Sequence, residues 1–220
     1  MLDNYIEAVK KIQDSIKEIL ESIFEANKIF LSAAVDECNE DEFGKAREKL
    51  KNISSKVDDI DNSIIKVLAL YSPEAKDLRE VVAYFKIDNE LLRAASNSRS
   101  LIRGFKDNCY MVDKEIITEY LVPLQTSALK ALEMTLQMID SDDVDELKDI
   151  YHLIIVEEDK TDELYSMLEK KIIQKIKDGD DFAKIHKMLR AFRRSEKIAD
   201  RTISIANLLL YIQDGGRLRR

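Results

Sequence analysis

Two pairs of acidic residues have the type and spacing to do chemistry. Glu196 and Asp200 lie four residues apart near the C-terminus, and Glu158 and Asp162 repeat the same spacing upstream. Residues four apart share one face of a helix, so each pair would present two carboxylates side by side. Buried carboxylates are costly unless they are paired, protonated, hydrated or bound to a metal. These four residues, with the adjacent Asp159, are therefore our candidate metal ligands.

Oxygen-only ligands favour hard cations such as iron, Mn²⁺ or Mg²⁺, whereas zinc is less natural without His or Cys. Neither His152 nor His186 follows a glutamate by three residues, so the Glu-x-x-His element of di-iron bundle enzymes is absent. The alternative without a metal is that the acids pair with Arg193, Lys197 or Arg201, or lie on a solvated face. Both interpretations, a metal site and a set of acids that binds no metal, stay open at this point.

Long amphipathic helices must position these acids. Apolar residues recur at steps of three and four on either side of Glu196, at Phe192, Ala199, Ile203, Ala206 and Leu210. The same pattern surrounds Glu158 and Asp162, at Leu147, Tyr151, Ile154, Tyr165, Leu168 and Ile172. Periodicity therefore assigns three of the acids to positions that face a core.

The composition favours an all-α protein, because five Gly, two Pro and 35% charged residues suit long amphipathic helices. The net charge of −8 argues against a general nucleic-acid binder, since phosphate contacts need a basic surface. The N-terminus has no signal-peptide pattern, and we find no uncharged run of membrane-spanning length. We expect a soluble, cytoplasmic protein that meets membranes only through partners, with Cys38 and Cys109 as reduced thiols.

Six helices are expected. The first ends near Asp36 and the second runs unbroken over 43–71; the others cover 72–104, 112–139 with a kink or start at Pro123, 141–179, and Asp180 or Asp181 to Gln213. The acidic segments of the second half align with segments of the first at nearly equal offsets of about one hundred residues, which favours a duplicated unit. We predict two tandem antiparallel three-helix bundles related by a pseudo-twofold, in domains 1–108 and 109–220.

The first half lacks most of the acidic positions. Where the second half has Glu158, Glu196 and Asp200, the equivalent positions hold Val57, Leu92 and Ser96. Carboxylates remain only at Asp58 and Asp61. An aliphatic side chain cannot coordinate a cation, so we expect at most one metal site, in the second half.

A basic run accompanies the last acidic pair, at Arg190, Arg193, Arg194, Lys197 and Arg201. One interpretation is that it binds an acidic partner helix or phosphate groups. The other is that these cations form ion pairs with acidic neighbours on a solvated face.

Three segments resemble the PhoU family of phosphate-signalling proteins: SPEAKDLREVVAYFKI (72–87), EEDKTDELY (157–165) and SEKIADRTISIAN (195–207). The resemblance covers almost the whole chain. It implies two tandem three-helix bundles and, in some members, multinuclear metal clusters held by Glu/Asp-x-x-x-Asp pairs. It also implies a non-enzymatic, cytoplasmic negative regulator that contacts a phosphate transporter ATPase subunit and a sensor histidine kinase. A homodimer is compatible with the same resemblance.

Two other functions stay open at this point. One keeps the fold but makes the protein an accessory subunit of a phosphate or cation permease. The other is a carboxylate-metal enzyme of the helical-bundle type, built on Glu158, Asp162, Glu196 and Asp200. Neighbouring transporter ATPase genes would favour the adaptor, whereas a single permease gene would favour the accessory subunit.

Overall fold

The computed structural model describes residues 2–36, 38–175 and 182–215. Within these ranges the chain forms helices and turns, with no strand, so the all-α prediction is confirmed. The first-half helices are α1 (Leu2–Val35), α2 (Glu40–Lys49), α3 (Ile53–Tyr71) and α4 (Ala75–Lys106). The second half contains the 3-10 turn η1 (Cys109–Met111), α5 (Lys114–Ile116), the π-helical turn η2 (Ile117–Leu121), α6 (Val122–Ile139), α7 (Val144–Lys175) and α8 (Phe182–Asp214).

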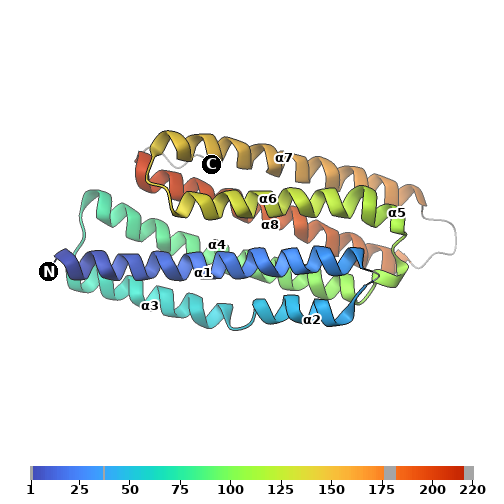
Figure 1. The fold of residues 1–220 in the computed structure, drawn as a ribbon, viewed down its shortest axis with the longest axis horizontal. Coiled ribbons are helices and arrows are strands. Elements are labelled where there is room, and N and C mark those ends of the chain that lie inside the picture. Colours follow the sequence, from blue (N-terminus) through green and yellow to red (C-terminus); the bar gives the residue numbers. More distant parts are fainter. Residues whose placement is uncertain (1, 37, 176–181, 216–220) are drawn as a thin grey trace.

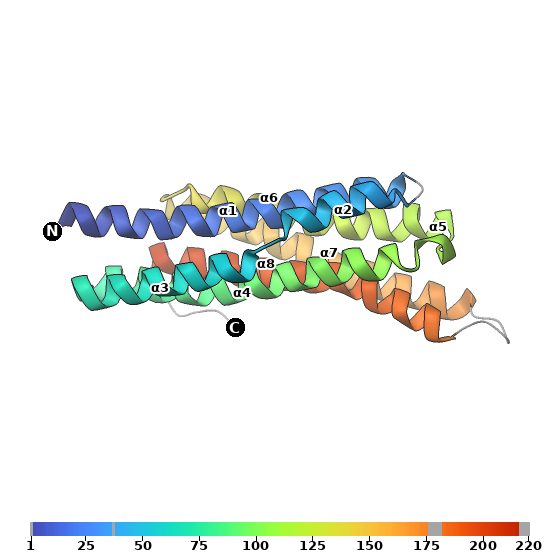
Figure 2. The same cartoon turned by 90° about the horizontal axis from the view of Figure 1, so that it is seen from below.

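The helices form two antiparallel bundles that lie against each other along their length (Figure 1). In the first bundle α1, the α2–α3 pair and α4 surround a common core, and in the second α6, α7 and α8 do the same. The predicted tandem architecture is confirmed. Helices α4 and α8 pack against each other more extensively than any other described pair and join the bundles (Figure 2). The domain boundary at 108/109 falls in the turn after α4 and stays a prediction.

Aromatic side chains show that the two halves share one core. The Phe105 ring on α4 lies 5.4 Å from that of Phe30 and 5.9 Å from that of Phe43, centroid to centroid. It also lies 6.0 Å from the ring of Phe192 on α8. All four rings are fully buried, and aromatic pairs at such distances contribute beyond their buried area. The core is therefore continuous across the interface between the bundles.

A buried polar network crosses the same interface. The Asn27 side chain on α1 donates to Ser98 Oγ on α4 at 2.8 Å and accepts from Gln125 Nε2 on α6 at 2.9 Å. The Ser195 hydroxyl on α8 donates to Gln125 Oε1 at 2.7 Å. Each half thus contributes one amide and one hydroxyl. Because buried polar groups need partners, this network fixes how the four helices align.

The prediction of one unbroken helix over 43–71 is wrong, because the helix is interrupted between α2 and α3. Asn52 adopts the left-handed conformation, with φ of 60°, which Asn tolerates better than most residues. The Arg99 guanidinium donates to the carbonyl of Leu50 at 3.0 Å and so satisfies a carbonyl at the break. Leu50 and Ile53 are both buried three residues apart, so the apolar spacing is unbroken although the helix is not.

Pro123 lies in the first turn of α6, directly after the π-helical turn, as the predicted start or kink requires. Proline has no N–H and its ring crowds the carbonyl four residues earlier, at Glu119, so the widened π turn accommodates it. The end predicted for the fifth helix, at 179, and the sixth-helix starts at 180 and 181 lie outside the described residues.

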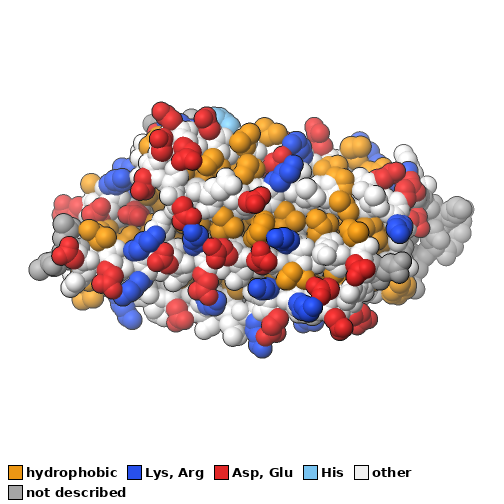
Figure 3. All heavy atoms as spheres, viewed as in Figure 1, with side chains coloured by type: hydrophobic (Ala, Val, Ile, Leu, Met, Phe, Trp, Pro, Cys, Tyr) orange, Lys and Arg blue, Asp and Glu red, His pale blue; other side chains and the backbone are white. Residues whose placement is uncertain are grey.

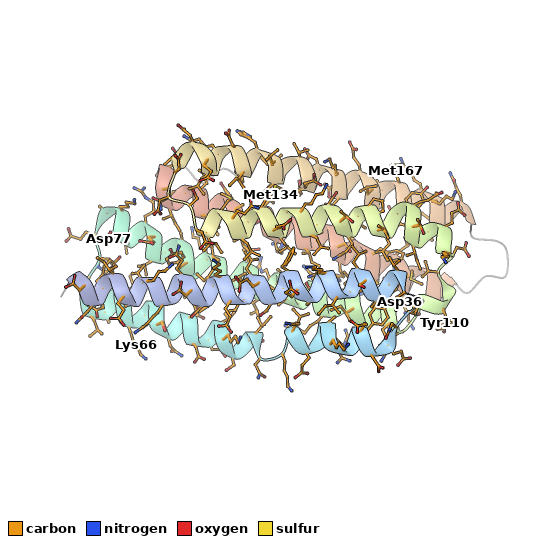
Figure 4. All side chains as sticks on the ribbon, viewed as in Figure 1. Asp36, Lys66, Asp77, Tyr110, Met134 and Met167 are labelled. Carbon is orange, nitrogen blue, oxygen red and sulfur yellow. A yellow bond between two sulfur atoms is a disulfide. The ribbon has the colours of Figure 1, made fainter. Side chains whose placement is uncertain are left out.

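Cys38 and Cys109 form a disulfide, with Cα atoms 6.1 Å apart, so the prediction of two reduced thiols is wrong. The bond joins the α1–α2 turn to η1. These turns are 71 residues apart in sequence but lie at the same end of the molecule, where Figure 4 shows Asp36 and Tyr110 close together. No described helix has the length and apolar character needed to cross a bilayer.

Candidate metal centre

Three of the predicted ligands come together where α7 packs against α8. Glu158 and Asp162 on α7 and Asp200 on α8 each bring a carboxylate oxygen within 4.8 Å of the other two. Glu158 and Asp200 are half-buried, whereas Asp162 is exposed. The group therefore lies at the rim of the interface and opens to solvent. The expectation that Asp162 points into the core is wrong.

Glu196 lies beside this group but is occupied by other charges. Lys197 Nζ bridges it to Asp200, at 2.8 Å from Glu196 Oε1 and 2.6 Å from Asp200 Oδ2. The residue Glu196 is 8% exposed, and its Oε2 atom has no hydrogen-bond partner and lies 3.8 Å from Arg193 Nε. Glu196 thus belongs to an ion-paired cluster next to the three grouped acids.

Asp159 is not part of the group. It follows Glu158 directly, so the helix turns its side chain about 100° away, and it is exposed. Its negative charge still contributes to the electrostatics of the group, because it helps to raise the pKa of Glu158.

The group carries more negative charge than its neighbours neutralise. Burial, followed by the charges of Asp162 and Asp200, raises the pKa of Glu158 to about 7. Burial also raises the pKa of Glu196, against the opposing hydrogen bond from Lys197. Although burial favours its neutral form, hydrogen bonds to Asp200 and Glu196 raise the pKa of Lys197. A bound cation would relieve this repulsion.

The donor set fits one hard cation. Three carboxylate oxygens from two helices suit Mg²⁺, Mn²⁺ or iron, with water completing the coordination. They are too few for a multinuclear cluster. Within residues 2–36, 38–175 and 182–215, this is the one group in which three or more metal-ligating side chains meet.

In the first half, Asp61 meets an acid that the sequence analysis missed. Asp88 on α4 is fully buried, its Oδ2 atom has no hydrogen-bond partner, and neither has the buried Oδ1 atom of Asp61 on α3. Burial, and then the neighbouring Asp61, raises the pKa of Asp88 to about 8, which favours the protonated form of Asp88 at neutral pH. Asp88 lies between Tyr84 and Leu91 at steps of four and three, and both are buried. This spacing could have revealed it. The other retained acid, Asp58, is exposed.

The basic run divides into paired and unpaired cations. Arg193 lies over the Tyr165 ring at 5.9 Å, and Arg201 Nη1 is 3.0 Å from Glu90 Oε2. Arg193, Lys197 and Arg201 therefore pair with acidic neighbours, as the second interpretation of the basic run predicts. Arg194 donates to the Asn97 side chain at 3.2 Å. Arg190 has no side-chain partner within the described part of the chain.

The fold defines a class of all-α proteins built from two joined three-helix bundles. Residues 123–209 match the family model of the PhoU domain. The structure of PhoU from Pseudomonas aeruginosa is similar at a TM-score of 0.81 and 17% identity, covering 98% of this chain and 100% of that one. The structure of the phosphate transport system regulatory protein PhoU from Streptococcus pneumoniae is similar at a TM-score of 0.78 and 18% identity. The match covers 98% of this chain and 99% of that one.

A putative PhoU-like phosphate regulatory protein from Shewanella oneidensis MR-1 is similar at a TM-score of 0.66 and 12% identity, covering 93% of this chain and 100% of that one. A search of curated proteins finds no match. Residues 123–209 are therefore similar to the PhoU domain, and nearly the whole chain has the fold of the solved PhoU structures, so the resemblance in its sequence is confirmed.

Proposed function

We propose that this protein is a regulatory adaptor of phosphate uptake and phosphate-responsive signalling. The main support is the match of 98% of the chain to a structure described as a phosphate transport system regulatory protein. The PhoU domain in residues 123–209 supports the same conclusion from sequence. The protein acts without catalysis of its own, in the cytoplasm.

The adaptor works through protein contacts and as a negative regulator, between a phosphate transporter ATPase subunit and a sensor histidine kinase. An apolar stripe on α4 supports such contacts. Leu78, Val82 and Phe85 follow at helical spacing and are 41%, 39% and 44% exposed. On the face in Figure 3, acidic and basic side chains are interspersed, so the surface charge there favours neither an acidic nor a basic partner. Exposed apolar residues grouped in this way are typical of contact surfaces.

Deletion of the gene tests the regulatory role. In cells grown at high phosphate, we expect the deletion to raise the expression of the phosphate transporter and of alkaline phosphatase, because the inhibitory input to the kinase is lost. Reporter fusions to both promoters measure the effect, and restoring the gene must reverse it. Unchanged expression combined with reduced phosphate or cation uptake would instead favour the permease-subunit alternative.

We further propose that Glu158, Asp162 and Asp200 hold one hard cation. The ion would link α7 to α8 and offset the repulsion that raises the pKa of Glu158. The Lys197 ammonium, 2.6 Å from Asp200, supplies part of the compensating charge and so disfavours a second ion.

Titration with Mn²⁺, followed by the loss of the free-ion signal in electron paramagnetic resonance, tests this centre. We expect about one Mn²⁺ per chain, and at least about tenfold weaker binding after Asp162→Asn or Asp200→Asn, because each removes a charged donor. Asp159→Asn is the matched control and should stay within about twofold. Equal losses in all three variants would mean non-specific attraction to an acidic surface.

A further inference from the structure

A pocket of about 560 Å³ lies at the end of the molecule that carries the disulfide. It lies between the last turns of α4, the η1 turn and the N-terminal part of α8. Gly104 and Ala191 line it where the helices nearly touch, since a Cβ on Gly104 would lie 3.0 Å from Ala191 Cβ. Because these two side chains are small, the longer side chains around them form most of the pocket wall.

The surrounding charge is strongly positive. Four cations, Arg103, Lys187, Arg190 and Arg194, line the pocket with a single acid, Asp107. Within the described ranges, the side chains of the first three have no hydrogen bond or ion pair. In a chain of net charge −8, such a gathering of unpaired cations is unexpected. Their mutual repulsion is unfavourable, and an anion in the pocket would offset it.

The lining residues favour phosphate groups over other anions. Guanidinium groups donate two parallel hydrogen bonds to phosphate oxygens, and three of the four cations are arginines. Four cations against one carboxylate suit a ligand with several negative charges. The Tyr110 ring is 77% exposed at this pocket and offers a flat apolar surface beside the cations. The volume is that of a small-molecule site.

We propose that this basic pocket binds a small molecule with two or more linked phosphate groups, and that Tyr110 stacks on the base when the ligand is a nucleotide. The inference does not depend on the metal centre or on the adaptor role. The cations converge on one pocket between α4, η1 and α8, which favours a small ligand over an extended acidic helix, because such a helix would need a groove along α4 or α8.

Calorimetric titration of the full chain with ATP, inorganic tripolyphosphate and inorganic phosphate tests the proposal at about 50 mM salt, where charge screening is weak. We expect ATP and tripolyphosphate to bind, and inorganic phosphate to bind much more weakly because it spans fewer cations. Arg190→Glu should weaken ATP binding by at least about tenfold.

The matched control is Lys66→Glu, the same charge reversal at an exposed, unpaired lysine near the opposite end of the molecule (Figure 4). Affinity should remain within about twofold in this variant. Equal weakening by Arg190→Glu and Lys66→Glu, or no binding of either polyphosphate to the wild type, would overturn the proposal. Circular dichroism of each variant verifies that the helices are retained.

Tyr110→Ala distinguishes the two sources of phosphate groups. We expect this change to weaken ATP binding several-fold and to leave tripolyphosphate binding unchanged, because only the nucleotide has a base to stack. An unchanged affinity for ATP would remove the nucleotide part of the proposal and assign the pocket to inorganic polyphosphate.

Discussion

Replacing Gln125 with leucine is expected to lower the free energy of unfolding by about 3 to 5 kcal/mol. The glutamine amide donates to Asn27 Oδ1 and accepts from the Ser195 hydroxyl, in a region closed to water. Leucine fills a similar volume but leaves both partners without their bond. Each unsatisfied buried group costs about 1 to 3 kcal/mol. Urea unfolding at neutral pH, followed by circular dichroism, measures the loss.

The control is Gln137→Leu, which makes the same change at an exposed position of α6. It should alter the free energy of unfolding by no more than about 0.5 kcal/mol. A double-mutant cycle with Asn27→Leu should show strong coupling, since the two amides contact each other directly. A Gln125→Leu loss below about 1 kcal/mol would show that the network contributes little to stability.

The second large effect is a dependence of stability on pH from Asp88. In the unfolded chain this carboxyl loses its proton above its ordinary pKa of 3.8, whereas in the folded protein its pKa is about 8. Between these values the folded state binds the extra proton, so stability falls as pH rises. We expect the wild type to lose on the order of 3 kcal/mol between pH 5 and pH 8.

Asp88→Asn should make this decline shallower and should leave the variant more stable than the wild type at pH 8. The amide has the shape of the protonated acid and cannot ionise. Burial also raises the pKa of Glu158, and this lowers stability with rising pH equally in the wild type and in Asp88→Asn. The difference between their two stability curves therefore isolates the contribution of Asp88. Asp59→Asn removes the same charge from the exposed side of α3 and should keep the wild-type slope. Parallel curves for wild type and Asp88→Asn would refute the assignment.

Helix content and most helix ends follow directly from apolar periodicity and from the scarcity of Gly and Pro. The break before Ile53 could not be predicted this way, because Leu50 and Ile53 keep the apolar spacing across it. A tertiary contact, the hydrogen bond from Arg99 to the Leu50 carbonyl, accompanies the break, and periodicity does not report such contacts. The disulfide also depends on tertiary structure, since it requires two distant turns to meet at one end of the molecule.

Helical spacing predicts which residues of the candidate site are neighbours on one helix. Four-residue steps correctly place Glu158 beside Asp162 on α7. They do not determine how α7 lies against α8, and that packing brings Asp200 into the group while leaving Glu196 to Lys197. Asp88 was missed because its carboxyl has no partner four residues away. Its partner Asp61 comes from a different helix.

The continuous core has a consequence for the history of the chain. After a duplication, a copy that loses its original task is usually free to decay. Here the first copy has Val57, Leu92 and Ser96 where the second has acids, yet its Phe105 and Asn27 complete the interior of the second copy. With the proposed cation bound, the two copies would divide the work, one supplying the ligands and the other a permanent scaffold.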